Sequence, residues 1–243
     1  MMKSTVKKTV SVITVLCILV SAFCVITGTA GAASNDRVKM YSAETYFCKY
    51  GITGTYVYVQ TKDNASNQQV TVHYNYLKGQ AWQDSDAEYF TTLADGSKLW
   101  KAYITSYNTE YAIKYVADGV TVWDNNNGKN YTTEKIGAAP INALRHNNYY
   151  GSTFTVNASL KNFAYEKDVK VRYTTNGWNS YKEAPMHYVS TGADGNELWI
   201  ATVNDNWNTG SNFQYCISYT ANGNTYWANN FGENYNASFR IYP

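Results

Sequence analysis

Apolar and polar residues alternate with a period of two along most of this chain. The segments Val70-Thr-Val-His-Tyr-Asn-Tyr76 and Val169-Lys-Val-Arg-Tyr173 show the alternation most clearly. A period of two is typical of strands that bury one face, and the spacing of an amphipathic helix is almost absent. The pattern therefore predicts about seven or eight short antiparallel strands in each half of the chain.

Two dipeptides predict tight turns at corresponding places in the two halves. Asp118-Gly119 and Asn222-Gly223 each separate two segments with the strand pattern. These residue pairs tolerate the positive φ angles that a two-residue type I′ hairpin requires. We expect an all-β fold of antiparallel β-sandwich domains of immunoglobulin-like size, with a small barrel as the alternative.

The two halves of the chain resemble each other over about a hundred residues, which indicates a duplicated domain, because solenoid units are only about 20–50 residues long. The matching segments are 54–59 with 151–156, 70–74 with 169–173, 94–100 with 193–199, and 111–115 with 215–219. We place one domain at 35–133 and the other at 138–243, with a linker region at about 134–148.

Residues 1–33 have the features of a secretory signal peptide. Lys3, Lys7 and Lys8 form a basic start, residues 10–26 are apolar, and Ala30-Gly-Ala32 offers a small-residue cleavage site. The apolar stretch is long for a signal peptide, so an uncleaved membrane anchor is the alternative. We expect an extracellular protein, either secreted or held at the cell surface.

Removal of residues 1–33 changes the charge and the cysteine count. Without their three lysines, the 20 basic residues fall to 17, against 18 acidic ones. No basic patch remains to suggest nucleic acid or an anionic membrane as a partner. Cys48 and Cys216 are left, one in each expected domain, and they could form a disulfide or remain as separate buried thiols.

A nine-residue signature occurs twice, as Trp123-Asp-Asn-Asn-Asn-Gly-Lys-Asn-Tyr131 and Trp227-Ala-Asn-Asn-Phe-Gly-Glu-Asn-Tyr235. An indole ring can stack on the C–H face of a sugar, and Asn can both donate to and accept from its hydroxyls. A polar turn beside a packing Trp is the alternative. Two copies favour a surface that recognises a neutral, hydroxyl-rich ligand.

These motifs resemble a known family. The run Val-Lys-Val-Arg-Tyr-Thr-Thr-Asn-Gly-Trp-Asn-Ser-Tyr, which ends at Tyr181, and the run 226–235 are similar to carbohydrate-binding module family 21. The run 123–131 is similar to the closing motif of that family, which includes starch-binding domains of fungal glucoamylases and glycogen-targeting subunits of protein phosphatase 1. The resemblance implies two β-sandwich modules that bind α-1,4-linked glucan, as starch, glycogen or maltooligosaccharides, without cleaving it.

The resemblance also implies roles for individual residues. Trp123 and Trp227 take the role of an aromatic platform, Tyr226 matches an aromatic just before it, and Trp178 matches a Gly-Trp element whose counterpart in the first copy is the displaced Trp82. The polar roles, as ligand contacts or loop braces, fall on Asn125, Asn126, Asn130, Asn229, Asn230 and Asn234.

The two copies depart from the family pattern in different ways. Val122 stands before the platform in the first copy, whereas Ala228 and Phe231 replace the family's Asp and Asn in the second. Some polar contacts are therefore expected to be lost, and the copies need not bind equally well.

Neither a metal site, a cofactor site nor a catalytic site is expected. The stretch Asp84-Ser-Asp-Ala-Glu88 lacks the Gly and the closing Glu of a calcium loop, so we expect a solvated loop there. Nucleophile elbows and phosphate loops are absent from the sequence. Glycosidases need two facing carboxylates, and the only ones that recur at equivalent positions, Asp95 and Asp194, lie in predicted turns.

The sequence therefore favours a non-catalytic extracellular glucan-binding protein, which could hold its ligand near separate amylases at a cell surface. A surface adhesion or scaffold protein with a protein partner is the alternative. Exposed Trp residues beside Asn-rich loops favour a sugar, whereas a contiguous apolar patch would favour a protein.

Overall fold

The computed structural model describes residues 36–47, 53–106, 109–132, 134–144, 149–150, 153–204 and 213–237. Apart from one 3-10 turn, the regular secondary structure of these residues is antiparallel strand, as the alternating pattern predicts. None of their helical structure is long and apolar enough to span a membrane. The predictions for residues 1–33 and Cys48 lie outside the described residues.

The strands occur in the following order. They are β1 (Val38–Phe47), β2 (Thr53–Thr61), β3 (Gln68–Asn75), β4 (Trp82–Asp86), β5 (Glu88–Thr92), β6 (Lys98–Ser106), β7 (Glu110–Ala117), β8 (Val120–Asp124), β9 (Ile141–Leu144), β10 (Tyr149–Tyr150), β11 (Thr153–Lys161), β12 (Lys167–Thr174), β13 (Lys182–Pro185), β14 (His187–Thr191), β15 (Asn196–Asn204), β16 (Phe213–Ala221), β17 (Asn224–Ala228) and β18 (Tyr235–Ala237), with a 3-10 turn η1 (Asn230–Gly232) before the last.

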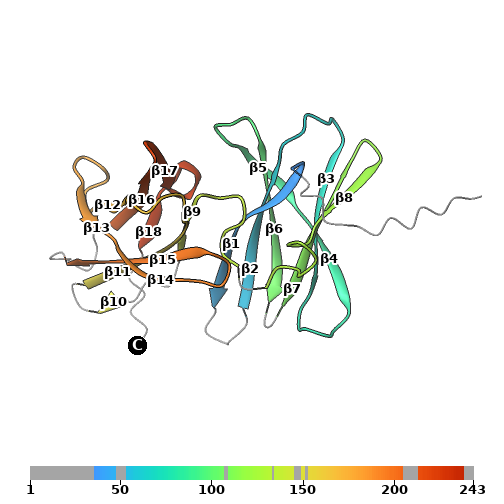
Figure 1. Cartoon of the computed structure of the whole chain (residues 1–243), viewed down its shortest axis with the longest axis horizontal. Helices are drawn as coiled ribbons and strands as arrows, with labels where there is room; N and C mark the ends of the chain where they lie inside the picture. Colours follow the sequence, from blue (N-terminus) through green and yellow to red (C-terminus); the bar gives the residue numbers. More distant parts are fainter. Residues whose placement is uncertain are drawn as a thin grey trace, which may run out of the picture. The chain divides into compact units, whose positions relative to one another are not determined.

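Strands β1 to β8 form the N-terminal sandwich, which has two four-stranded sheets (Figure 1). One sheet has the order β1-β2-β6-β5 and the other β4-β3-β7-β8. Val57 and Val59 of the first sheet meet Val72, Ile113 and other apolar side chains of the second in one buried core. Burial of an aliphatic side chain of this size contributes about 1.5–3 kcal/mol, so this core is the main source of stability.

Strands β9 to β18 form the C-terminal sandwich around a second core. The β10-β11-β15-β14 sheet carries β9 beside β11, and the β13-β12-β16-β17 sheet carries β18 beside β16. Phe154, Val156 and Leu160 alternate inward along β11 and pack against Ile217 and Tyr219 of β16. The β-sandwich expected from the sequence is thus the fold observed.

The two predicted hairpins are present. Asp118 and Gly119 have φ angles of 50° and 77°, and Asn222 and Gly223 have 50° and 75°. Positive φ at both central residues is the requirement of a type I′ turn, whose twist matches that of the flanking strands. By contrast, the expectation of a solvated loop at the acidic stretch is wrong. Trp82–Asp86 and Glu88–Thr92 form the strands β4 and β5, each at the edge of one sheet.

Strand register shows how the two sandwiches correspond. Val59 lies opposite Trp100, and Ala158 lies opposite Trp199, so β2 and β11 match with an offset of 99 residues. The sequence comparison of 54–59 with 151–156 has an offset of 97 and is therefore two residues out of register. Both offsets keep the same residues on the inner face, because strand faces alternate with a period of two.

Asp124, the second residue of the first signature, connects β1 with the closing part of that signature through hydrogen bonds. Its carboxylate accepts a hydrogen bond from the Met40 backbone N–H at 2.7 Å and from the Tyr131 hydroxyl at 2.8 and 2.9 Å. The Tyr131 ring stacks on Tyr111 of β7 at 5.3 Å. The carboxylate therefore joins β1 to the end of the signature, and its counterpart Ala228 offers no such acceptor.

We predict that Asp124→Ala lowers the free energy of unfolding by about 1–3 kcal/mol, because it leaves donors without their acceptor at a mostly buried site. Urea denaturation of the intact chain measures the change. Asp168→Ala is the control, because its exposed ion pair with Lys170 should contribute only about 0–1 kcal/mol. An equal loss of unfolding free energy in both variants would show that the hydrogen bonds of Asp124 do not stabilise the fold.

Candidate functional site

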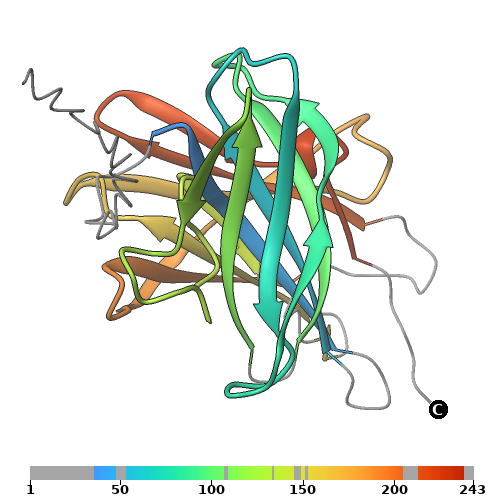
Figure 2. The same ribbon diagram turned by 90° about the vertical axis from the view of Figure 1, so that its right-hand side faces the viewer.

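Three side chains gather on the outer face of the β4-β3-β7-β8 sheet, the face seen in front in Figure 2. Trp82 stacks on His73, with ring centroids 4.8 Å apart and an interplanar angle of 16°. Trp123 meets the other side of the same imidazole edge-on at 5.7 Å. Trp82 is 38% exposed and Trp123 is 44% exposed. We call Trp82, His73 and Trp123 the N-terminal platform.

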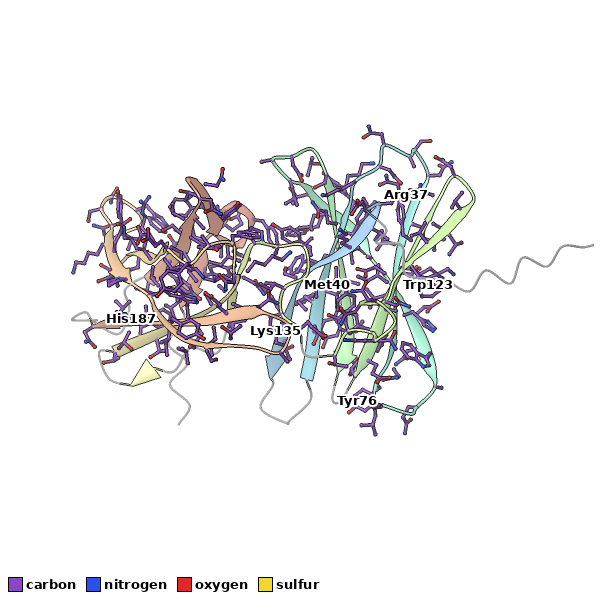
Figure 3. The ribbon with its side chains drawn as sticks, in the orientation of Figure 1. Arg37, Met40, Tyr76, Trp123, Lys135 and His187 are labelled. Carbon is purple, nitrogen blue, oxygen red and sulfur yellow. The ribbon has the colours of Figure 1, made fainter. Side chains whose placement is uncertain are left out.

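The period of the strands explains why these residues face outward. Val72 and Tyr74 point into the core from β3, so His73 between them must point away from it. The neighbouring position on β7 is Ala112, which pairs with His73 in the sheet. Its small side chain lies buried under the platform and lets the Trp123 ring reach across to His73. Figure 3 shows Trp123 on the side of the sandwich away from β1 and β2.

The C-terminal sandwich carries the same arrangement with different side chains. Arg172 of β12 lies between two rings, with its Cζ atom 4.3 Å from the centroid of Tyr181 and 5.0 Å from that of Trp227. Trp227 is 42% exposed and Tyr181 is 54% exposed. Cation–π contacts of this kind stabilise exposed pairs by about 0.5–1 kcal/mol and orient the rings. We call Tyr181, Arg172 and Trp227 the C-terminal platform.

An acidic side chain holds the central basic residue of each platform. His73 Nδ1 lies 2.5 Å from Asp84 Oδ1, and Arg172 donates from Nε and Nη2 to Glu183 Oε1 at 2.9 and 2.8 Å. The Glu183 carboxylate raises the pKa of the Arg172 guanidinium. Asp84 and Glu183 thus occupy equivalent positions, which corrects the view that only Asp95 and Asp194 recur.

Cys216 forms the floor of the C-terminal platform, where Ala112 lies in the other sandwich. It pairs with Arg172 across β12 and β16 and is a free, buried thiol. Burial raises its pKa to about 11, so the thiolate is disfavoured and the side chain behaves as a small apolar residue.

The Asn residues of the two signatures build the loops next to the platforms. Asn125 Oδ1 accepts from the Gly128 N–H at 3.0 Å, and Asn126 Nδ2 donates to the Asn130 carbonyl at 3.0 Å. In the second copy, Asn229 Oδ1 accepts from Gly232 at 3.2 Å, and Asn230 Nδ2 donates to the Asn234 carbonyl at 3.2 Å. We call residues 124–131 and 228–235 the closing loops.

Backbone geometry explains the choice of Asn in these loops. Positive φ angles between 51° and 57° occur at the equivalent pairs Asn126 with Asn230 and Asn130 with Asn234. Asn adopts this left-handed region more readily than other residues with a side chain. The side-chain amides of Asn125, Asn126, Asn229 and Asn230 therefore each make a hydrogen bond within their own loop. Loop bracing is one of the two roles that the sequence implied for these residues.

Two predicted aromatic residues do not join the platforms. Tyr226 precedes Trp227 on β17 and so points to the opposite side, where it packs on the core and contacts Phe163 and Tyr219. Its counterpart Val122 packs on the N-terminal core, so this difference between the copies concerns core packing.

Trp178 is also set apart from the exposed rings. It is half-buried in the turn before β13, at a φ of 68°. Its Nε1 is buried without a hydrogen-bond partner among the described residues.

His73, Arg172 and Tyr181 are platform residues that the sequence motifs did not identify. Their signal was the outward position of His73 and Arg172 in two matching strands, but the partners across the sheet could not be assigned without the register. Each platform presents flat apolar rings beside groups that donate and accept hydrogen bonds. Within the described ranges, no cluster of three or more His, Cys, Asp or Glu side chains is placed to hold a metal ion.

Comparisons with known proteins match part of the chain. Residues aligned with protein phosphatase 1 regulatory subunit 3C of Bos taurus are 31% identical over 87 positions, which cover 34% of this chain and 27% of that protein. Glycogen-binding subunit 76A of Drosophila melanogaster is 26% identical over 85 positions, 34% of this chain and 12% of that protein. The chain thus spans about a quarter or less of the length of these relatives.

Among solved structures, the starch-binding domain of Rhizopus oryzae glucoamylase in complex with beta-cyclodextrin and maltoheptaose is 28% identical. The alignment covers 42% of this chain and 94% of that domain, with a TM-score of 0.36. Residues 146–238, which contain the C-terminal platform and its closing loop, match the family model of the carbohydrate/starch-binding module, family 21.

Proposed function

We propose that the protein binds α-1,4-linked glucan outside the cell, without cleaving it, and that both sandwiches bind. The observation that carries this proposal is the repetition of one platform at equivalent positions of two sheets. In each platform, two exposed rings flank a basic side chain that an acidic residue holds in place. The family match of residues 146–238 supports a starch- or glycogen-like ligand for the C-terminal platform.

The chemistry of the platforms fits a neutral sugar chain. Glucose units present C–H faces that can lie on Trp123 or Trp227, and hydroxyls that can pair with the nearby basic and acidic groups. A curved glucan can contact two rings at once because the exposed rings of each platform come from separate segments, such as Trp82 on β4 and Trp123 on β8. The extracellular location is part of the proposal and is supported by the pattern of residues 1–33.

Binding without hydrolysis is proposed because of the state of the carboxylates. Asp84 is hydrogen-bonded to His73, and Glu183 is hydrogen-bonded to Arg172. These carboxylates are therefore engaged, as is Asp86 on the same strand as Asp84, which accepts a hydrogen bond from Thr71, and they do not form the facing acid and base that a glycosidase requires. A scaffold that binds a protein partner remains the competing function, and the experiments below distinguish it because it requires no affinity for glucan.

We predict that Trp123→Ala and Trp227→Ala each weaken binding of maltoheptaose to their own platform by about 1–3 kcal/mol, by analogy with the stacking of bases on aromatic rings. Both rings lie on the outer face of their sheets and are more than 40% exposed, so the melting temperature should stay close to that of the wild type. Calorimetry and thermal unfolding measure the two quantities. Tyr165→Ala is the control, because that ring is 99% exposed and belongs to neither platform. Unchanged affinity in both Trp variants would contradict the proposal.

We further predict that the two platforms act together on a polymer. On granular starch, loss of one platform should reduce the affinity of the intact chain by about 10², because the second binding step is intramolecular when both sites can engage. On a short maltooligosaccharide, the same variant should only lose one of two binding sites, with the remaining site unaltered. Granule and calorimetric assays of the single and double Trp variants test this. A single variant that equals the wild type on granules would show that the altered platform is not used.

No reducing sugar should be released from soluble starch, because neither platform has the carboxylate pair of a glycosidase. Purified protein is incubated with starch and compared with buffer. The Trp123→Ala/Trp227→Ala double variant, purified in the same way, controls for a contaminating amylase. Sustained release by the wild type that the double variant lacks would refute a purely binding function.

A further inference from the structure

Position 231 is where the two closing loops differ most in size. The N-terminal loop has Asn127 with a φ of 57°, and the C-terminal loop has Phe231 with a φ of 58°. Asn adopts this left-handed conformation readily, whereas a bulky aromatic residue is strained in it. Strain of this kind costs on the order of 1–3 kcal/mol and persists only where surrounding contacts impose the conformation. Phe231 should therefore have contacts that favour it.

Those contacts come from the N-terminal sandwich. The Phe231 ring lies 5.0 Å from Tyr58 of β2, 5.1 Å from Phe90 of β5 in an edge-on arrangement, and 6.4 Å from Tyr41 of β1. Tyr58 points to the outer side of its sheet, because Val57 and Val59 beside it point into the core. It is nevertheless only 2% exposed. The outer face of the β1-β2-β6-β5 sheet is thus covered where Phe231 meets it.

This aromatic face belongs to one sandwich only. Lys101 of β6 adds a cation over it, 5.6 Å from the Tyr58 centroid and 5.3 Å from that of Phe90. By strand register, the counterparts of Tyr58, Phe90 and Lys101 in the C-terminal sandwich are Asn157, Val189 and Ile200. One copy carries the aromatic face and the other carries the aromatic side chain that packs on it, so the two changes are complementary.

The segment between the sandwiches is also held in place. Ala138 N–H donates to the Met40 carbonyl at 2.7 Å, Gly137 N–H to the Tyr41 carbonyl at 2.9 Å, and the Ala43 N–H to the Lys135 carbonyl at 3.0 Å. A Cβ atom on Gly137 would lie 2.0 Å from the Met40 carbonyl oxygen, so the close approach requires glycine. The chain then enters β9, which pairs with β11.

Side chains reinforce this attachment. Asn142 of β9 donates from Nδ2 to the carbonyls of Ala43 and Lys135, at 3.3 and 3.1 Å. Lys135 donates to Thr45 Oγ1 at 2.7 Å, and burial lowers the pKa of its ammonium group. The described part of the expected linker is therefore bonded to β1 on one side and continues into a sheet on the other.

We propose that Phe231 is an anchor between the sandwiches, and that its contact with Tyr58 and Phe90 holds the two binding platforms at a fixed separation and orientation. The C-terminal closing loop then has two roles, as a neighbour of its platform and as a docking element for the N-terminal sandwich. A rigid pair loses less orientational freedom when both platforms engage one ligand than a pair on a flexible linker does.

A double-mutant cycle in the intact chain tests this anchor. Phe231→Asn introduces the residue that the N-terminal loop has at the same backbone geometry, so the loop should fold. Phe90→Val introduces the residue that the C-terminal sheet has at that position. The midpoint of denaturation is measured for each single variant and for the double variant. The relief of strain by Asn is common to both backgrounds and cancels in the comparison.

If the anchor exists, Phe90→Val lowers the midpoint more in the wild-type background than in the Phe231→Asn background, where only its contacts with Tyr58 and Lys101 are lost. Tyr103→Thr is the matched control, since Tyr103 is on the same face but contacts Tyr56, and Thr202 is its counterpart. Its effect should be equal in both backgrounds. Additive effects of Phe231→Asn and Phe90→Val, or no effect of Phe90→Val in either background, would overturn the proposal. The test does not depend on glucan binding.

Discussion

The register of neighbouring strands is the constraint on which the rest of this structure depends. Because faces alternate residue by residue, a slip of one position along β3 would bury His73 and expose Val72. The buried rows of Val, Ile and Tyr prevent such a slip, since every inner residue would lose its core contacts at once. The register that stabilises the sandwich thus also places side chains from three separate strands, β4, β3 and β8, next to one another in the N-terminal platform.

The platforms show that one geometry tolerates different chemistry. His73 lies between two indole rings, whereas Arg172 lies between a phenol and an indole. Arg keeps its charge at all ordinary pH values and has five donors, while a neutral imidazole has one donor and one acceptor. The acidic partner across the sheet fixes the central side chain in both cases. The two surfaces therefore share a shape but differ in the hydrogen bonds that they can offer to a hydroxyl-rich ligand.

The closing loops make a similar point about backbone conformation. Both loops have positive φ angles at the same four signature positions, three in succession and one two residues later, and both use Asn amides to hold that path. These hydrogen bonds hold the same backbone conformation in both loops, although the residue at the equivalent positions 127 and 231 differs. Asn127 has a side chain that favours this backbone conformation. Phe231 is strained in the same conformation, but its ring contacts Tyr58 and Phe90.

The sequence by itself determined the fold class and the hairpins at Asp118-Gly119 and Asn222-Gly223. These follow from local physics, because period, turn geometry and φ preference act over a few residues. It also indicated that some Asn side chains brace the loops. Tyr226 matches an aromatic position of the motif, and alternation along the strand directs its ring toward the core.

Only the tertiary structure decided which distant residues meet. Trp123 with His73, Trp227 with Arg172, and Phe231 with Tyr58 are separated by 50, 55 and 173 positions in the chain. Their proximity depends on strand order and register, which result from the packing of whole sheets. A pattern of single residues cannot encode that choice, because many registers preserve the same alternation and only the complete core selects one.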